Sequence, residues 1–559
     1  MKLRGKGLLF DRRCQCGIVG GGIASFFFLA LAPIAVGQGS GSTRTLSVPV
    51  PGPESASPRV SRTVSGRVTN GLSGVPIPRA LVNVSGRSVL TDAQGHFTLQ
   101  EFTQQEAYVR VTKPGFTEAQ DGVDGSGLQR LTLGLDDPLE LTLMPDGLVT
   151  GTVTGSDGAG LARVPVQLRA ERFDLGTPRW NQVGFSFTDA HGIFRLVAPP
   201  GRYRLKTGFS PRTADRGDAI LPVTYPKDGV SGDGDFFDLG SGEERRVYLR
   251  PRMGPPRALT VHVESAELQA QLQLTAGSGN GDQFAVAFQR TGVEGEYLVE
   301  LPEGSYTIEA LSTSRERTTE GTAKVSVASG GPSTARLVLT ELAPFPVQVI
   351  TDGRGGLPPS DELSALRSLN LYLRNIANDG DGSDTDAQLA AGLNGAVSFQ
   401  ARSGRYRLAS TVSGRGWYVK AASVGSSNLM EDELVVGPGA AGSSLQIVLS
   451  NATGRVHGTV AQAMQPGAEW VYLIPMFDSL IPYFEAYVQP NGTFSWSGPV
   501  GNYHVAALDH RLREDIHDPA VRRRLLANER MVEVTLGVDS PAILPAPEVR
   551  AIHPAEVPQ

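Results

Sequence analysis

Four aspartates alternate with small residues between positions 379 and 386, and carboxylates at this spacing are typical ligands of calcium. The segment reads Asp-Gly-Asp-Gly-Ser-Asp-Thr-Asp. It departs from a twelve-residue calcium loop, because its sixth position holds Asp384 where glycine is expected and no glutamate closes the loop. Two interpretations stay open: a solvated hairpin tip, which we favour, and a calcium site at Asp379, Asp381, Asp384 and Asp386.

Tryptophans are the second group that could bind a ligand, because a flat exposed ring stacks on the face of a sugar. Trp496 falls on an inward position of an alternating strand and is expected in the core. Trp417 belongs to a short sequence segment that we interpret as part of the fold and not as a binding site. Trp180 stands in a polar stretch and is predicted to be exposed, whereas Trp470, in a strand, is ambiguous. Trp180 and Trp470 are therefore the candidates for carbohydrate binding.

Catalytic patterns are missing from the sequence. It contains neither a Gly-x-Ser-x-Gly nucleophile elbow nor a P-loop. His96 and His191 belong to equivalent Asp-x-x-Gly turns, where a solvated turn position is favoured over a paired site. We therefore expect a protein that is not an enzyme.

A repeated β-hairpin must position these residues. In one copy Phe194 and Leu196 alternate with polar neighbours, a Pro-Gly turn follows, and Tyr203 and Leu205 repeat the alternation. Two glycines nine residues apart and a tyrosine two residues later recur four times with identical spacing. The four sets are Gly192, Gly201 and Tyr203; Gly295, Gly304 and Tyr306; Gly395, Gly404 and Tyr406; and Gly492, Gly501 and Tyr503. We expect positive φ at each glycine and the tyrosines in the core.

The repeat predicts an all-β chain of about five small antiparallel β-sandwiches with a period near 100 residues. One helix is expected at Pro519 to Asn528, because Asp518 is a good N-cap and proline suits the first helical position. The predicted segments are a signal peptide at 1–37, a disordered linker at 38–62, module one at 63–144, module two at 145–254, module three at 257–342, module four at 343–450, module five at 452–548 and a frayed tail at 549–559.

The first 37 residues have the composition of an export signal. A basic start precedes an apolar run from Ile18 to Val36, and Ala35-Val36-Gly37 offers small residues for cleavage. An uncleaved membrane anchor is the alternative, because the apolar run is long. Both cysteines, Cys14 and Cys16, fall inside the segment, so the mature chain needs no disulfide. We predict a periplasmic, outer-membrane-associated or extracellular protein with no membrane span after cleavage.

Net charge argues against a nucleic acid partner. Removing residues 1–37, with five basic residues and one acidic residue, shifts the formal charge from −6 to −10. Nucleic acids and anionic membrane surfaces bind proteins through a basic surface. A net charge of −10 does not favour such a surface.

Three segments of module one resemble the carboxypeptidase regulatory-like domain: Val64-Ser65-Gly66-Arg67-Val68, residues 76–84 and residues 91–97. That family is a small transthyretin-like sandwich, similar to carbohydrate-binding-like modules, which follows the catalytic domain in some metallocarboxypeptidases. The whole layout is similar to large exported acidobacterial proteins that carry this domain. The resemblance implies a fold and very little about function.

We therefore expect a non-catalytic scaffold at the bacterial envelope whose partners are envelope proteins or polysaccharide. The alternative is a polysaccharide-binding protein that uses its loops or an exposed aromatic. No cofactor is expected apart from the calcium considered above.

Overall fold

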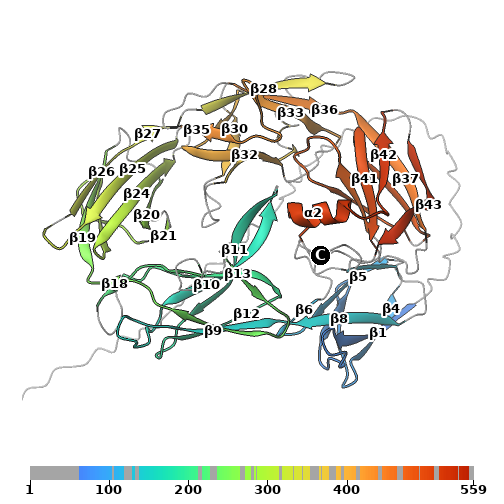
Figure 1. Ribbon diagram of the computed structural model, residues 1–559, viewed down its shortest axis with the longest axis horizontal. Helices are drawn as coiled ribbons and strands as arrows, with labels where there is room; N and C mark the ends of the chain where they lie inside the picture. The colour runs from blue at the N-terminus through green and yellow to red at the C-terminus, as the bar shows by residue number, and fades with distance from the viewer. Residues whose placement is uncertain are drawn as a thin grey trace, which may run out of the picture. The chain divides into compact units, whose positions relative to one another are not determined.

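The computed structural model describes most of the chain from Arg62 to Ile552. The described residues are 62–102, 106–118, 129–132, 138–174, 176–211, 217–226, 236–264, 271–278, 283–284, 286–313, 318–331, 333–342, 344–352, 364, 366, 368–376, 386–391, 396–410, 416–437, 444–461, 470–489, 491–508, 515–538 and 541–552. The predicted signal peptide, with both cysteines, lies outside them. Residues 60–559 form one compact unit, and each repeat within it is built from two facing sheets (Figure 1).

Module two shows the strand order of the two sheets that modules one and three repeat. One sheet has the order β12-β9-β17, in which the opening strand pairs antiparallel with the hairpin strand and parallel with the closing strand. The other sheet has the order β11-β10-β13-β15, with β16 also on β13, and β14 pairs with β18. The strands are β9 (Gly147–Val153), β10 (Pro165–Asp174), β11 (Thr177–Phe187), β12 (Ile193–Ala198), β13 (Gly201–Thr207), β14 (Ala219–Ile220), β15 (Thr224–Tyr225), β16 (Phe237–Leu239), β17 (Glu244–Leu249) and β18 (Met253–Gly254).

Modules one and three repeat this arrangement. Module one has sheets β4-β1-β8-β6 and β3-β2-β5-β7, and module three has β22-β23-β19-β26 and β21-β20-β24-β25-β27. The strands of module one are β1 (Arg62–Asn70), β2 (Leu81–Val84), β3 (Arg87–Leu90), β4 (His96–Phe102), β5 (Glu106–Thr112), β6 (Phe116–Glu118), β7 (Gln129–Thr132) and β8 (Leu139–Pro145). Those of module three are β19 (Arg257–Glu264), β20 (Gln271–Ser278), β21 (Gln283–Phe284), β22 (Gln289–Arg290), β23 (Glu296–Leu301), β24 (Gly304–Thr313), β25 (Thr318–Val327), β26 (Ser333–Val338) and β27 (Thr340–Glu341).

In modules four and five the two sheets are also joined by hydrogen bonds along one edge. The orders are β34-β33-β36-β28-β31-β30-β29-β32-β35 and β39-β38-β41-β43-β37-β40, with β42 on β41. The strands of module four are β28 (Pro344–Asp352), β29 (Leu371–Asn375), β30 (Ala387–Ala391), β31 (Val397–Gln400), β32 (Gly404–Ser410), β33 (Tyr418–Val424), β34 (Ser427–Asn428), β35 (Leu434–Val436) and β36 (Leu445–Ser450). Those of module five are β37 (Thr453–Ala461), β38 (Trp470–Pro475), β39 (Phe484–Tyr487), β40 (Thr493–Pro499), β41 (Gly501–Leu508), β42 (Val532–Leu536) and β43 (Ala542–Ile552).

The helix α2 (Pro519–Leu526) covers the outer face of one sheet of module five. Asp518 caps it as predicted, accepting a hydrogen bond from the Ala520 amide, and the helix ends two residues before the predicted Asn528. Its buried Leu525 packs on Ala506 and Leu508 of β41. A short helical stretch also precedes β29.

The repeat tyrosines lie in the core, as predicted. Tyr203, Tyr306, Tyr406 and Tyr503 are at most 2 % exposed. In modules two, three and five the hydroxyl donates to the carbonyl of the proline four residues earlier: Tyr203 to Pro199 at 2.5 Å, Tyr306 to Pro302 at 2.8 Å and Tyr503 to Pro499 at 2.7 Å. The ring therefore bends back over its own turn, which is the arrangement of a tyrosine corner.

The two repeat glycines have different roles. Positive φ is confirmed at the first glycine in four modules, between 73° and 80° at Gly95, Gly192, Gly295 and Gly492. It is not found at the second glycine of modules two to four, so that prediction was wrong there. A Cβ on Gly304 would lie 3.3 Å from the Tyr306 hydroxyl, and one on Gly201 or Gly404 would lie 3.4 Å from the tyrosine ring. The second glycine makes room for the bent tyrosine.

Two predicted boundaries are wrong. The tail predicted at 549–559 is a strand as far as Ile552, because Val549 and Ile552 are buried and β43 pairs in parallel with β37 and β41. The predicted linker overlaps the first strand by one residue, since β1 begins at Arg62. Residues 553–559 lie outside the described part of the chain.

Replacing Tyr306 with phenylalanine tests the corner. The change leaves the Pro302 carbonyl without its donor and should reduce the free energy of unfolding by about 1 kcal/mol. Tyr406→Phe is the matched control. Arg402 takes the place of the proline there, and the Tyr406 hydroxyl has no hydrogen-bond partner in the described structure. Thermal unfolding followed by circular dichroism should show a drop in melting temperature for the first variant only. Equal drops would contradict the role of the hydrogen bond.

Candidate functional site

Trp180 does not offer the exposed face that was predicted for it. Its side chain is 4 % exposed, and the guanidinium of Arg204 lies 4.0 Å from the centre of the ring. Glu171 of β10 is its cross-strand neighbour. The polar sequence around Trp180 suggested solvent, but the ring packs against Arg204 of its own sheet and stacks with the ring of Phe236 at 6.5 Å. The prediction of exposure is therefore wrong.

Trp470 is half-buried at the first position of β38. It packs against the apolar cluster beneath α2, and its ring meets that of Tyr487 edge to face at 6.3 Å. Sugar binding by Trp470 stays a prediction, with much of the ring already used in packing.

Asp386 is the one member of the predicted calcium motif that falls in the described residues, because Asp379, Asp381 and Asp384 lie outside them. Its carboxylate pairs with Arg179 at 3.3 Å, approaches Arg374 at 4.0 Å and accepts a hydrogen bond from the Asn375 amide at 2.9 Å. Two guanidinium groups already balance its charge, so Asp386 does not fit a calcium ligand. In the described ranges no group of three or more His, Cys, Asp or Glu side chains could hold a metal.

The two turn histidines occupy solvated turns, as favoured. The carboxylate of Asp189 accepts hydrogen bonds from the His191 and Ile193 amides, which lower its pKa, and Asp92 holds the corresponding turn in module one. The only His-x-x-Glu pair of the sequence, His553 and Glu556, lies outside the described residues.

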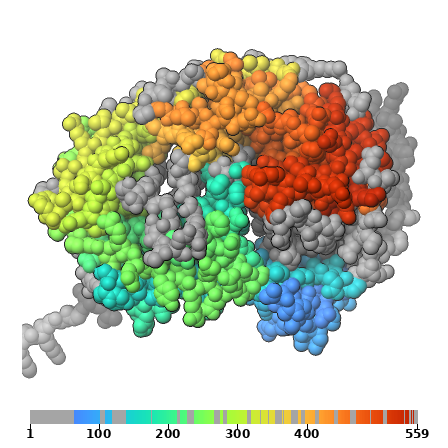
Figure 2. All heavy atoms as spheres, viewed as in Figure 1, coloured from blue at the N-terminus to red at the C-terminus, as the bar shows by residue number. Residues whose placement is uncertain are grey.

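A cavity of about 290 Å³ lies where modules four and five meet. Module four contributes β32 and the turn between β34 and β35, and module five contributes the segment after β38 and the helix α2. In Figure 2 the orange atoms of module four and the red atoms of module five abut. The lining residues are Arg407, Leu408, Leu429, Met430, Glu431, Asp432, Ile474, Pro475, Phe477, Ser479, Leu480, Ile481, Pro482, Arg522 and Leu526.

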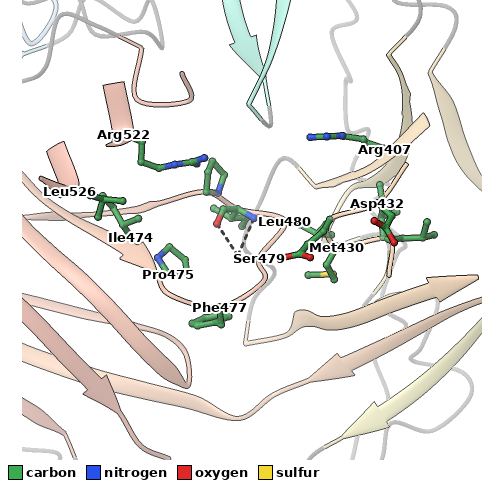
Figure 3. Close-up of a pocket in the computed structure, with 15 residues that line it drawn as sticks. Arg407, Met430, Asp432, Ile474, Pro475, Phe477, Ser479, Leu480, Arg522 and Leu526 are labelled. Atoms are coloured by element: carbon green, nitrogen blue, oxygen red, sulfur yellow. Dashed lines mark hydrogen bonds between the residues drawn. The ribbon is translucent and has the colours of Figure 1, made fainter. Parts of the chain in front are cut away.

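The polar side chains of this cavity come from both modules. Figure 3 shows the guanidinium groups of Arg407 and Arg522 pointing toward each other, with Asp432 on the side of module four. Arg407 projects from β32 because Leu408, its neighbour in the alternation, faces the core. Arg522 stands one turn into α2, held by the Asp518 cap.

The cavity lining carries charges of both signs. Burial lowers the pKa of Arg522, although Asp518 opposes this effect. Arg407 reaches the carboxylate of Glu433 at 4.0 Å. A hydrogen bond with Asp478 raises the pKa of Glu431, and the negative charges of Asp478 and Asp432 raise it further. A ligand with both hydrogen-bond donors and a negative group would complement this lining.

Tyr248 is the most exposed of the aromatic residues, among those that the structure describes, that the sequence analysis did not single out. Tyr248 on β17 is 77 % exposed, between the buried Val247 and Leu249. Across the outer face of sheet β12-β9-β17 it is in register with Thr152 and Ile193. The alternation in Arg-Arg-Val-Tyr-Leu is the signal that could have identified it, because a tyrosine between two core positions must point outward.

Comparison with known proteins identifies the first module. Residues 63–142 match the carboxypeptidase regulatory-like domain. The resemblance stated above for module one is therefore confirmed. No curated protein matches the chain.

Solved structures with β-sandwich domains are similar to parts of the chain at low identity. The Bacillus anthracis TIE protein is 16 % identical, with 50 % of each chain covered and a TM-score of 0.17. GBS52, the minor pilin of Streptococcus agalactiae, is 13 % identical, with 35 % of this chain and 97 % of that chain covered and a TM-score of 0.20. A streptococcal ancillary pilin is 12 % identical over 50 % and 99 %, with a TM-score of 0.18. The match thus spans half the length of the TIE protein.

Proposed function

We propose that this chain is a non-catalytic, exported scaffold of five β-sandwiches that acts at or outside the bacterial envelope. We assign the modules the bounds predicted above, with the fifth extended to Ile552. The observation that carries the proposal is the shortness of the connections. Only Asp146 separates β8 from β9, and only Asn451 and Ala452 separate β36 from β37. At about 3.5 Å per residue, such connections keep neighbouring modules in contact.

Side chains from one module enter the core of the next. Leu480, from the segment after β38, belongs to the buried cluster of module four. Leu221 belongs to that of module three, and Phe209 stacks on Phe284 at 5.2 Å. Apolar burial of this kind resists separation of the modules in a way that a flexible linker does not.

An ion network joins modules three and four. Arg402 contacts the carboxylates of Glu320 at 2.9 Å and Glu309 at 3.1 Å, and all three side chains are less than a quarter exposed. Burial lowers the pKa of Arg402, but the hydrogen bonds and charges of the two glutamates outweigh it and raise the pKa. The amide and hydroxyl of Ser403 also donate to Glu320. The apolar contacts and the ion network therefore both favour a fixed arrangement of neighbouring modules.

Export is supported by the sequence. The basic and apolar composition of residues 1–37 and the absence of cysteine from 38–559 suit a secreted chain that needs no disulfide. Among the described residues, no helix has the length and apolar character needed to traverse a lipid bilayer.

Arg402→Ala tests the scaffold. The substitution leaves two partly buried carboxylates without their cation and should cost about 1–3 kcal/mol of stability. Differential scanning calorimetry should show a lower melting temperature, and limited proteolysis should show faster cleavage between modules three and four.

Arg405→Ala is the matched control. Arg405 forms an exposed ion pair with Glu433, and surface pairs of this kind contribute less than about 1 kcal/mol. If the two variants were equally stable and equally resistant to protease, the ion network would have no part in holding the modules.

Saccharide binding is a second candidate function, favoured by the exposed face around Tyr248. In the next row of the same sheet Arg246, Thr150 and Arg195 lie in register and offer hydrogen-bond donors. An aromatic ring beside such polar groups can stack on a sugar while its neighbours bond the hydroxyls.

Tyr248→Ala should weaken retention on an immobilised β-glucan or xylan about tenfold, the effect of losing roughly 1.4 kcal/mol of stacking. Phe187→Ala is the control, because Phe187 is 60 % exposed on the other sheet of module two. Affinity electrophoresis measures both. No retention of the wild type, or equal loss in both variants, would remove this candidate.

A further inference from the structure

We propose that the cavity between modules four and five binds a hexuronate, a sugar ring with one carboxylate, presented by an acidic polysaccharide. The proposal rests on the saccharide-binding function above, but it concerns a separate site and a narrower class of ligand.

Size restricts the ligand to one sugar ring. A cavity of about 290 Å³ is at the lower limit of small-molecule sites. The cavity is partly open to solvent, so a neighbouring sugar of a chain can extend out of it.

The arginines favour a carboxylate. Arg407 and Arg522 come from different modules and point toward each other (Figure 3). A planar guanidinium pairs with both oxygens of a carboxylate, and such charge-assisted bonds are stronger than neutral ones. Arg522 is partly desolvated, and a ligand anion would offset that cost.

The acids of the cavity favour hydroxyl groups beside the carboxylate. Asp432 and Glu431 lie next to each other in the turn between β34 and β35, and both line the cavity. Carboxylates accept hydrogen bonds from sugar hydroxyls and repel further negative charge. A sugar ring with one carboxylate and several hydroxyls can pair with the arginines and donate hydrogen bonds to the acids. A phosphate or sulfate dianion would suit the arginines but be repelled by the acids.

Apolar side chains complete the surface. Phe477, Leu480 and Met430 line the cavity and can pack against the C–H face of a pyranose. Leu480 also belongs to the core of module four, so the wall of the cavity exists only while the two modules are docked. A bound sugar should therefore stabilise this junction.

Isothermal titration calorimetry with trigalacturonate tests the proposal on the full mature chain. Arg407→Gln and Arg522→Gln should each weaken binding at least tenfold. Arg405→Gln is the control, because Arg405 is on the same strand as Arg407 but does not line the cavity. The methyl ester of trigalacturonate should bind at least tenfold more weakly than the free acid. Circular dichroism should show equal melting temperatures for the three variants.

Each other outcome has a definite meaning. Equal binding of acid and ester, or unchanged binding by both cavity variants, would overturn the uronate site. Loss of binding in Tyr248→Ala alone would place the sugar on the sheet face, so the cavity proposal would fail while saccharide binding stood. If neither trigalacturonate nor the neutral glycans bound the wild type, both proposals would fail.

Discussion

In three of the four tyrosine repeats the same hydrogen bond closes the turn, because the buried hydroxyl donates to the carbonyl of the proline four residues earlier. Tyr306 bends back to the carbonyl of Pro302, and a Cβ on residue 304 would crowd its hydroxyl at 3.3 Å. The Gly-x-Tyr spacing thus reflects one hydrogen bond, from the tyrosine hydroxyl, and one close contact, between the glycine and the tyrosine. Burial also raises the pKa of Tyr203 and Tyr306 to about 12. Their contribution to stability is full below pH 10, the usual tyrosine range, and is lost as the pH rises toward 12.

A second close contact fixes the facing sheet. A Cβ on Gly151 would collide with the Phe194 ring at 2.5 Å, and one on Gly458 would lie 2.3 Å from Phe494. The opening strand therefore carries glycine where the hairpin strand carries phenylalanine. Modules three and four have Val261 opposite Tyr297 and Phe345 opposite Phe399 instead. These pairs let one sandwich be repeated with little other sequence in common.

Local patterns predicted the fold well and the candidate site poorly. Alternation and turn spacing identified the sandwiches, the buried tyrosines and the Asp518 cap, because all of these depend on neighbours within about ten residues. Trp180 was placed wrongly because its burial depends on Arg204, a residue of another strand. The cavity could not be predicted, since Arg407 and Arg522 are more than a hundred residues apart and meet only when two modules dock. Tyr248 was readable from alternation.

The proposed scaffold and the proposed binding site depend on the same contacts. Leu480 is at once part of the core of module four and part of the cavity wall, so a ligand and the junction between modules stabilise each other. Arg402 performs the equivalent structural role between modules three and four through two carboxylates. Three of the four junctions have buried or partly buried contacts of this kind among the described residues, and these contacts oppose extension of the chain.

The most direct test of the account is the distance between spin labels on adjoining modules. The mature chain has no native cysteine, so single cysteines can be placed at the exposed Val293 of module three and Val435 of module four. Pulsed electron paramagnetic resonance should give one narrow distance distribution, which broadens in Arg402→Ala. A broad distance distribution in the chain without Arg402→Ala, as expected for modules joined by flexible linkers, would contradict the scaffold.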